Sequence, residues 1–179
     1  MREGVSVAKC FSEAIFGSMQ YVQKATPIIS KLLGGRTIAV EGDDNEVCKL
    51  LDMQCGIDYL QVHENGLVVG IASRFQDYPN MRTFTVRNKR ENGAKTEMEK
   101  RQLAIKHRFI YPALTMQGYV QKGDIVGIGI TSTRQLLWFV ERGYAKSQHT
   151  GEDQKGQAAF WVCRWDDMRN HGIKVLEWP

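Results

Sequence analysis

The feature that most constrains the fold of this chain is a pair of β-prone segments on either side of one Asn-Gly dipeptide. Residues 57–62 read Ile-Asp-Tyr-Leu-Gln-Val, and residues 67–72 read Leu-Val-Val-Gly-Ile-Ala. Asn65-Gly66 between them tolerates the positive backbone φ angles of a tight primed turn. The pattern therefore predicts an antiparallel β-hairpin over residues 57–72.

Helical and extended patterns alternate on both sides of this hairpin. Apolar residues recur at three- and four-residue steps over residues 7–33, where Thr26-Pro27 predicts a break between two helices. Residues 145–157 are polar and contain glycine, so they predict a loop. The other predicted elements are a strand at 36–40, a helix ending at Gly56, a strand at 83–87, a helix at 96–107 capped by Thr96, a second hairpin formed by 115–121 and 125–130, a helix beginning at 132 or 133, and a strand at 158–165.

The length of 179 residues favours one domain, because two domains of half that size would each be marginally stable. We expect an α/β (α+β) fold in which helices flank a central mixed β-sheet with a hairpin core. Residues 1–35 would form an N-terminal helical segment and residues 44–131 the core. Residues 132–179 would add a strand and helices at the C-terminal side.

The sequence carries no pattern typical of a membrane protein, a secreted protein or a zinc site. No apolar run approaches the roughly 20 residues that cross a bilayer, and residues 1–6 do not resemble the start of a signal peptide. The four cysteines form no CxxC pair, and the four histidines lack the HxxxH spacing. We expect a cytoplasmic protein with no membrane partner and no transition metal.

Positive charge is concentrated in one part of the chain. Residues 82–108 hold nine basic and three acidic residues, a net charge of +6, whereas the whole chain carries +4 and the remainder therefore −2. Clustered Lys and Arg favour a polyphosphate partner because binding releases counterions. The alternative is a solvated basic face. If the partner is DNA, the residues expected to contact its backbone are Arg82, Arg87, Lys89, Arg90, Lys95 and Arg101.

The order of elements over residues 44–131 resembles the core of the PD-(D/E)XK, or restriction-endonuclease-like, nuclease superfamily. A helix is followed by Asp58 at the first hairpin strand, and Gly70-Ile71-Ala72-Ser73-Arg74 is similar to the family's Gly-Ile-Glu-x-Lys form. The resemblance implies a metal site in which hard oxygen ligands hold one or two Mg²⁺ (or Mn²⁺) ions, and a metal-bound water attacks the phosphate.

The resemblance also assigns roles to individual residues. Asp58 stands at the family's aspartate, and Glu46 lies where a helical acid is expected, with Asp52 as a competitor. Ala72 replaces the second acid, and Arg74 replaces the lysine. An arginine stabilises negative charge but does not readily release a proton, so Arg74 would hold the phosphate rather than act as a base.

Neighbouring residues offer replacements for the missing acid and lysine. Residues two apart on a strand share a face, so Gln76 would point the same way as Ala72 and supply a carbonyl oxygen. Glu97 and Lys100 on the following helix are further candidates. The expected set is thus Glu46, Asp58 and Glu97 around the metal, with Asp58, Arg74, Gln76 and Lys100 in catalysis.

Each assignment has a structural alternative. Asp58 would equally cap a loop or pair with Arg74, and Glu46 would equally interact with the helix dipole. Residues 96–101 would then form only an exposed helix with internal charge pairs. The four tryptophans are more typical of core or rim aromatics than of base-stacking platforms.

Three functions remain open at this point. The first is a Mg²⁺-dependent phosphodiester hydrolase, an endonuclease or nickase, that acts on DNA. The second is a catalytically inactive nucleic-acid-binding or accessory protein of the same fold. The third is an interaction protein of a phage or mobile element that counters a defence system through the basic surface. A homodimer or a larger complex is compatible with each of them.

Overall fold

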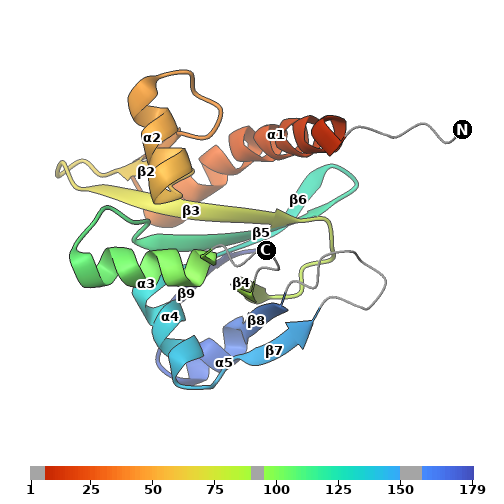
Figure 1. The fold of residues 1–179 in the computed structure, drawn as a ribbon, viewed down its shortest axis with the longest axis vertical. Helices are drawn as coiled ribbons and strands as arrows, with labels where there is room; N and C mark the ends of the chain where they lie inside the picture. The colour runs from red at the N-terminus through yellow and green to blue at the C-terminus, as the bar shows by residue number, and fades with distance from the viewer. Residues whose placement is uncertain (1–6, 90–94, 150–158) are drawn as a thin grey trace, which may run out of the picture.

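The computed structural model describes residues 7–89, 95–149 and 159–179, which fold into helices around two β-sheets. The main sheet divides the molecule (Figure 1), with α1 on one side and the smaller sheet, α4 and α5 on the other. The helices are α1 (Val7–Leu33), α2 (Glu46–Cys55), α3 (Glu97–His107), α4 (Thr133–Glu141) and α5 (Trp165–Asn170). The strands are β1 (Arg36–Ala39), β2 (Tyr59–Val62), β3 (Val68–Gln76), β4 (Thr83–Lys89), β5 (Leu114–Gln121), β6 (Asp124–Ser132), β7 (Lys146–His149), β8 (Ala159–Arg164) and β9 (Val175–Trp178).

The six-stranded sheet has the order β1-β2-β3-β5-β6-β9 and is mixed. The β3 and β5 strands pair in parallel, whereas the other neighbours are antiparallel. The parallel pair needs a long crossover, which contains β4 and α3. The predicted α/β class with a central mixed sheet is therefore confirmed.

The second sheet contains three strands in the order β4-β8-β7. Residues 83–87, predicted as a strand of the core, pair instead with β8 in this separate antiparallel sheet. Residues 146–149, expected in a loop, form β7 on the other edge of β8. The rest of that expected loop, from residue 150 onward, lies outside the described residues.

Hydrophobic cores form on both faces of the six-stranded sheet. On one face, Val22, Ala25 and Ile29 of α1 pack against residues such as Met116 of β5. On the other, Tyr119 of β5 joins a cluster that includes Phe84, Leu136 and Trp165. Alternate residues of β5 thus enter opposite cores, as the two-residue period of a strand requires.

The two hairpins differ in their turns. The β2–β3 hairpin is present, but its turn is not the primed turn we predicted. The Gly66 N–H donates to His63 O at 2.9 Å, and Gly66 carries the positive φ of 83°. The β5–β6 hairpin instead has positive φ at both Lys122 and Gly123, the pattern of a primed turn.

The N-terminal helix is also continuous, although Pro27 predicted a break. Residues 7–33 form one helix with Pro27 inside it. Proline removes one backbone donor, but Val22, Ala25 and Ile29 around it are fully buried, and this packing holds the helix on the sheet. Among the described residues, no helix combines the length and the apolar character needed to cross a membrane.

Candidate active-site pocket

A pocket of about 320 Å³ lies where the C-terminal turn of α2, the start of β2, the middle of β3 and one side of α3 meet. Figure 1 shows α2 and α3 passing in front of β3 and β5. The polar side chains that line the pocket are Asp52, Gln54, Cys55, Asp58, Ser73, Glu97, Lys100, Arg101 and Tyr111. Three carboxylates and two cationic groups therefore face the same space.

Local backbone structure places Asp58 in this pocket. The α2 helix ends at Gly56, whose left-handed backbone (φ 64°) reverses the chain into β2. The Asp58 N–H donates to Ile71 O at 2.9 Å, which aligns the residue with β3. The backbone N–H of Ser73 in turn donates to Asp58 Oδ2. One oxygen of the Asp58 carboxylate is thus fixed by the sheet itself.

The electrostatic environment of Asp58 disfavours its charged form. Burial, with smaller contributions from the nearby carboxylates Glu41 and Asp52, outweighs the lowering effect of the Ser73 N–H and raises the pKa of Asp58 to about 7. Burial also raises the pKa of Asp52. Strongly raised carboxyl pKa values in a pocket are typical of functional sites, because structural carboxylates are normally paired with a cation.

Glu97 lies at the pocket wall between two arginines. Its Oε2 accepts from Arg74 Nη2 at 3.0 Å, and its Oε1 pairs with Arg101, one turn along α3. Arg101 is only 6% exposed and also donates to Thr115 Oγ1 at 3.2 Å. We name Arg74, Glu97 and Arg101 the pocket cluster, in which two cations share one carboxylate.

A layer of polar side chains continues from this cluster between the two sheets. Arg74 Nη1 donates to Thr85 Oγ1 at 3.3 Å, and Gln76 Nε2 donates to the same oxygen at 3.4 Å. Thr85 Oγ1 donates to Gln117 Oε1 at 3.2 Å. Arg74 and Gln76 share one face of β3, as predicted, but this face meets the second sheet.

The structure gathers only part of the predicted site. Asp58, Glu97, Lys100 and Arg101 line one pocket, and Arg74 reaches it through Glu97. Gln76 is not among the lining residues, nor is Glu46, which is exposed in the first turn of α2. Asp52 lines the pocket instead, because the helix meets β2 at its C-terminal end.

Several pocket residues were not predicted from the sequence, among them Ser73 and Tyr111. Ser73 contributes its backbone N–H, which almost any residue type would supply, so its side chain does not indicate this role. Tyr111 follows α3 in the loop to β5, and its hydroxyl accepts from Arg134 Nε at 2.6 Å. In the sequence, Tyr111 before Pro112 indicates only the end of a helix. Its position at the pocket is visible only in the folded structure.

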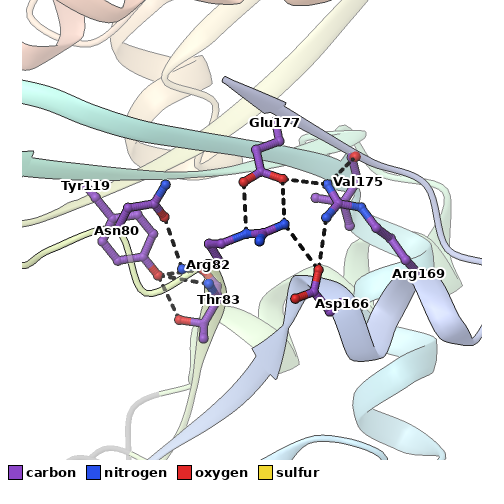
Figure 2. A network of polar contacts seen from close by, with 8 residues as sticks. All are labelled: Asn80, Arg82, Thr83, Tyr119, Asp166, Arg169, Val175 and Glu177. Atoms are coloured by element: carbon purple, nitrogen blue, oxygen red, sulfur yellow. Dashed lines mark hydrogen bonds and ion pairs between the residues drawn. The ribbon is translucent and has the colours of Figure 1, made fainter. Parts of the chain in front are cut away.

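Arg82 was predicted to contact a DNA backbone. It directly precedes β4 of the second sheet and is held there in an ion-pair network. Figure 2 shows its guanidinium between Glu177 and Asp166, with Nε 2.9 Å from Glu177 Oε1 and Nη2 3.2 Å from Asp166 Oδ1. Arg169 binds the same two acids at 2.9 and 3.2 Å. We name these four residues the distal network, in which two cations meet two anions.

The other residues of the predicted basic surface occupy different environments. The Arg87 guanidinium is half-buried and lies 5.5 Å from the centre of the Phe160 ring. Lys95 is exposed, whereas Arg101 points into the pocket cluster. Arg90 and the Lys89 side chain lie outside the described residues. The basic segment is therefore not one continuous surface in the described part of the chain.

No set of three or more histidine, cysteine or acidic side chains within the described residues is close enough together to hold a metal ion. Comparison with protein-family models, curated proteins and solved structures gave no significant match in any of the three.

Proposed function

We propose that this protein is a Mg²⁺-dependent phosphodiester hydrolase that acts on DNA, with its reaction centre in the pocket between α2 and α3. The observation that carries the proposal is the pairing of two carboxylates, Asp52 and Asp58, in one pocket with Lys100 and Arg101. A phosphodiester brings negative charge, which the cationic side chains favour, while the paired acids favour a bound cation.

The two acids suit Mg²⁺ in particular. Mg²⁺ is usually held by one or two carboxylates, several waters and the substrate phosphate, so it does not require a third protein ligand. Burial is the main cause that raises the pKa of Asp58, and the charges of Glu41 and Asp52 add to it, so a divalent ion would favour the charged form of Asp58. When bound, the ion would supply a water of lowered pKa and neutralise charge on the phosphate.

The remaining side chains of the pocket would bind and orient the phosphate. Lys100 is exposed at the pocket and has no ion-pair partner among the described residues, so its ammonium group would contact a phosphate oxygen. The pocket cluster has a net charge of +1 because Glu97 offsets only one of its two arginines. Asp58, whose pKa is about 7 without the metal, would release its proton when the ion binds.

This assignment differs from the set expected from the sequence. We propose Asp52 rather than Glu46 as the helical acid, because Asp52 lines the pocket. Glu97 would position Arg74 and Arg101 instead of binding the metal, since both of its oxygens already accept from arginines. The likeness to the PD-(D/E)XK superfamily, argued from the order of elements, remains part of this proposal.

Conversion of supercoiled plasmid to the nicked or linear form tests the proposal. The wild-type protein should cut in Mg²⁺ or Mn²⁺ and be inactive in EDTA. Asp58→Ala and Asp52→Ala should each lose at least about 100-fold in rate, since each removes a proposed metal ligand. Glu46→Ala is the matched control, an acid of the same helix outside the pocket, and should keep the wild-type rate.

Cleavage by Asp58→Ala at the wild-type rate would contradict the proposed site. Equal losses in Glu46→Ala and Asp52→Ala would contradict the replacement of Glu46 by Asp52. Circular dichroism of each variant would show whether a loss of activity reflects a loss of folding.

A second candidate is a nucleic-acid-binding protein of the same fold without catalysis. Two observations favour it: Ala72 offers no ligand atom to the pocket, and Glu97 is engaged by two arginines. Such a protein should bind DNA in EDTA, with affinity falling steeply as salt rises. Metal-independent binding without any plasmid cutting would favour this candidate over the hydrolase.

A further inference from the structure

The end of α3 and the loop after it expose basic and apolar side chains in direct succession. Lys106, His107 and Arg108 are exposed, and Phe109 and Ile110 follow with 66% and 65% of their surface exposed. We name residues 106–110 the rim segment. Large apolar side chains beside each other at this level of exposure are typical of a binding surface.

The fold makes little use of the Phe109 side chain. Arg108 adopts a left-handed backbone (φ 59°), and the Phe109 N–H donates to Ala104 O at 2.8 Å. In such a helix ending, the residue at the Phe109 position commonly packs against the one at the Ala104 position. Alanine is too small to cover a phenyl ring, and Phe109 instead stacks on His107, with ring centres 5.7 Å apart and planes at 27°.

The rim segment is continuous with the pocket. Ile110 and Tyr111 line the pocket together with Lys100 and Arg101, and Phe109 immediately precedes them. A nucleotide whose phosphate enters the pocket would therefore place its neighbouring base near an exposed aromatic ring. Base–aromatic stacking beside cationic groups is the usual means by which proteins hold unpaired nucleotides.

Charge distinguishes this surface from a second apolar surface nearby. Val47, Leu50 and Met53 are exposed on α2, which begins with Glu46 after Asp43 and Asp44. The rim segment carries Lys106 and Arg108 and no acid. A polyanion would be repelled at the start of α2 and attracted to the rim segment, so the rim segment fits nucleic acid.

We infer that the DNA substrate presents an unpaired base beside the phosphate in the pocket, and that this base stacks on Phe109. The inference rests on the proposed function and narrows its substrate to single-stranded or locally unpaired DNA. In a continuous duplex, each base already stacks on its neighbours and offers no free face to the ring.

Equilibrium binding in EDTA tests the inference without any requirement for catalysis. A fluorescein-labelled single strand and a hairpin-closed duplex of the same sequence would be titrated by fluorescence anisotropy. The wild-type protein should prefer the single strand. Phe109→Ala should weaken single-strand binding by about 5- to 100-fold, as expected for one lost base stack, and change duplex binding by less than about twofold. Phe109→Trp should restore the single-strand affinity.

Tyr78→Ala is the matched control. Tyr78 is 63% exposed but follows the C-terminal end of β3, whereas Phe109 precedes the N-terminal end of β5. Because β3 and β5 are parallel, these two positions lie at opposite ends of the strand pair. Removal of Tyr78 should leave both affinities unchanged. A Phe109→Ala protein that binds single strands as the wild type does would overturn the inference but leave the proposed function standing. Failure of the wild-type protein to bind any DNA would overturn both.

Arg108 gives a second, independent test. Its left-handed backbone suits glycine better than any other residue, so Arg108→Gly should keep or raise the melting temperature. The same change removes a cation from the rim segment and should weaken single-strand binding several-fold at low salt. Unchanged binding in this variant would contradict a role of the rim segment in DNA binding.

Discussion

The pocket cluster and the distal network are both built from arginines that share carboxylates, yet they differ in balance and burial. In the distal network, Arg82 and Arg169 meet Asp166 and Glu177, so the charges cancel. In the pocket cluster, Arg74 and Arg101 share Glu97 alone. The side chain of Arg101 is 7% exposed, against 44% for Arg82. The first arrangement is a closed structural unit, whereas the second leaves positive charge at the wall of a pocket.

This difference cannot be predicted from the sequence, because Arg82 and Arg101 both belong to the basic segment, residues 82–108. Exposed ion pairs contribute little to stability, since water and salt screen them. Breaking a buried pair by removing one partner is much more costly, because it leaves a charge without compensation. The two regions should therefore respond differently to matched substitutions.

The largest expected effect is a pH dependence of the free energy of unfolding that is caused by Asp58. The folded-state pKa of Asp58 is about 7, above its ordinary value of 3.8, so the folded protein holds a proton that the unfolded chain releases between these pH values. The free energy of unfolding should therefore fall as the pH rises from about 4 to about 7, by up to about 4 kcal/mol, and level off above. Urea unfolding across this pH range would measure it.

Asp58→Asn should remove most of this pH dependence, because the amide does not titrate. Glu177→Gln in the distal network should retain it. The same pH dependence in wild-type protein and Asp58→Asn would show that the effect originates elsewhere.

The next largest effect is a difference in the free energy of unfolding between substitutions of Glu97 and Glu177, each of which binds two arginines. Glu97→Gln should lower the free energy of unfolding by about 2 kcal/mol, because buried Arg101 loses its counter-charge. Glu177→Gln should cost about 1 kcal/mol or less, because Asp166 still pairs with both arginines. Urea unfolding at neutral pH would compare them, and equal losses would contradict the distinction between the two regions.

The smallest expected effect is that of Asp166→Asn. The Asp166 side chain is 54% exposed, so its loss should change the free energy of unfolding by less than about 1 kcal/mol. The difference from wild type should shrink further when the salt concentration is raised from 0.01 to 1 M, in line with the shorter Debye length. A larger loss of stability that does not depend on salt would contradict the view that Asp166 forms only exposed, screened ion pairs.

Local patterns in the sequence predicted much of the fold. The hairpin around Asn65-Gly66, the Thr96 cap and the hairpin around Lys122-Gly123 depend on neighbouring residues, and all three are present. The membership of β4 in a second sheet was missed, because its partner β8 lies far along the chain. The helix break at Pro27 was wrong because tertiary packing outweighs a local penalty.

The candidate site was predicted in part for similar reasons. Asp58 was visible because it begins a hairpin strand, and Lys100 because it lies on the next predicted helix. The choice of Asp52 over Glu46 depends on which end of α2 faces β2, which only the fold decides. The contact of Arg101 with Thr115 Oγ1 joins α3 to β5, and only the fold brings these two elements together.

The most direct test of the account is the titration of the Asp58 carboxyl group, followed by ¹³C NMR with and without Mg²⁺. The account predicts a midpoint near pH 7 in the absence of Mg²⁺, because burial and the nearby acids disfavour the charged form. Saturating Mg²⁺ should shift that midpoint to lower pH, because a bound cation favours the carboxylate. A midpoint near pH 4 that Mg²⁺ does not change would contradict a cation-binding centre formed by Asp52 and Asp58.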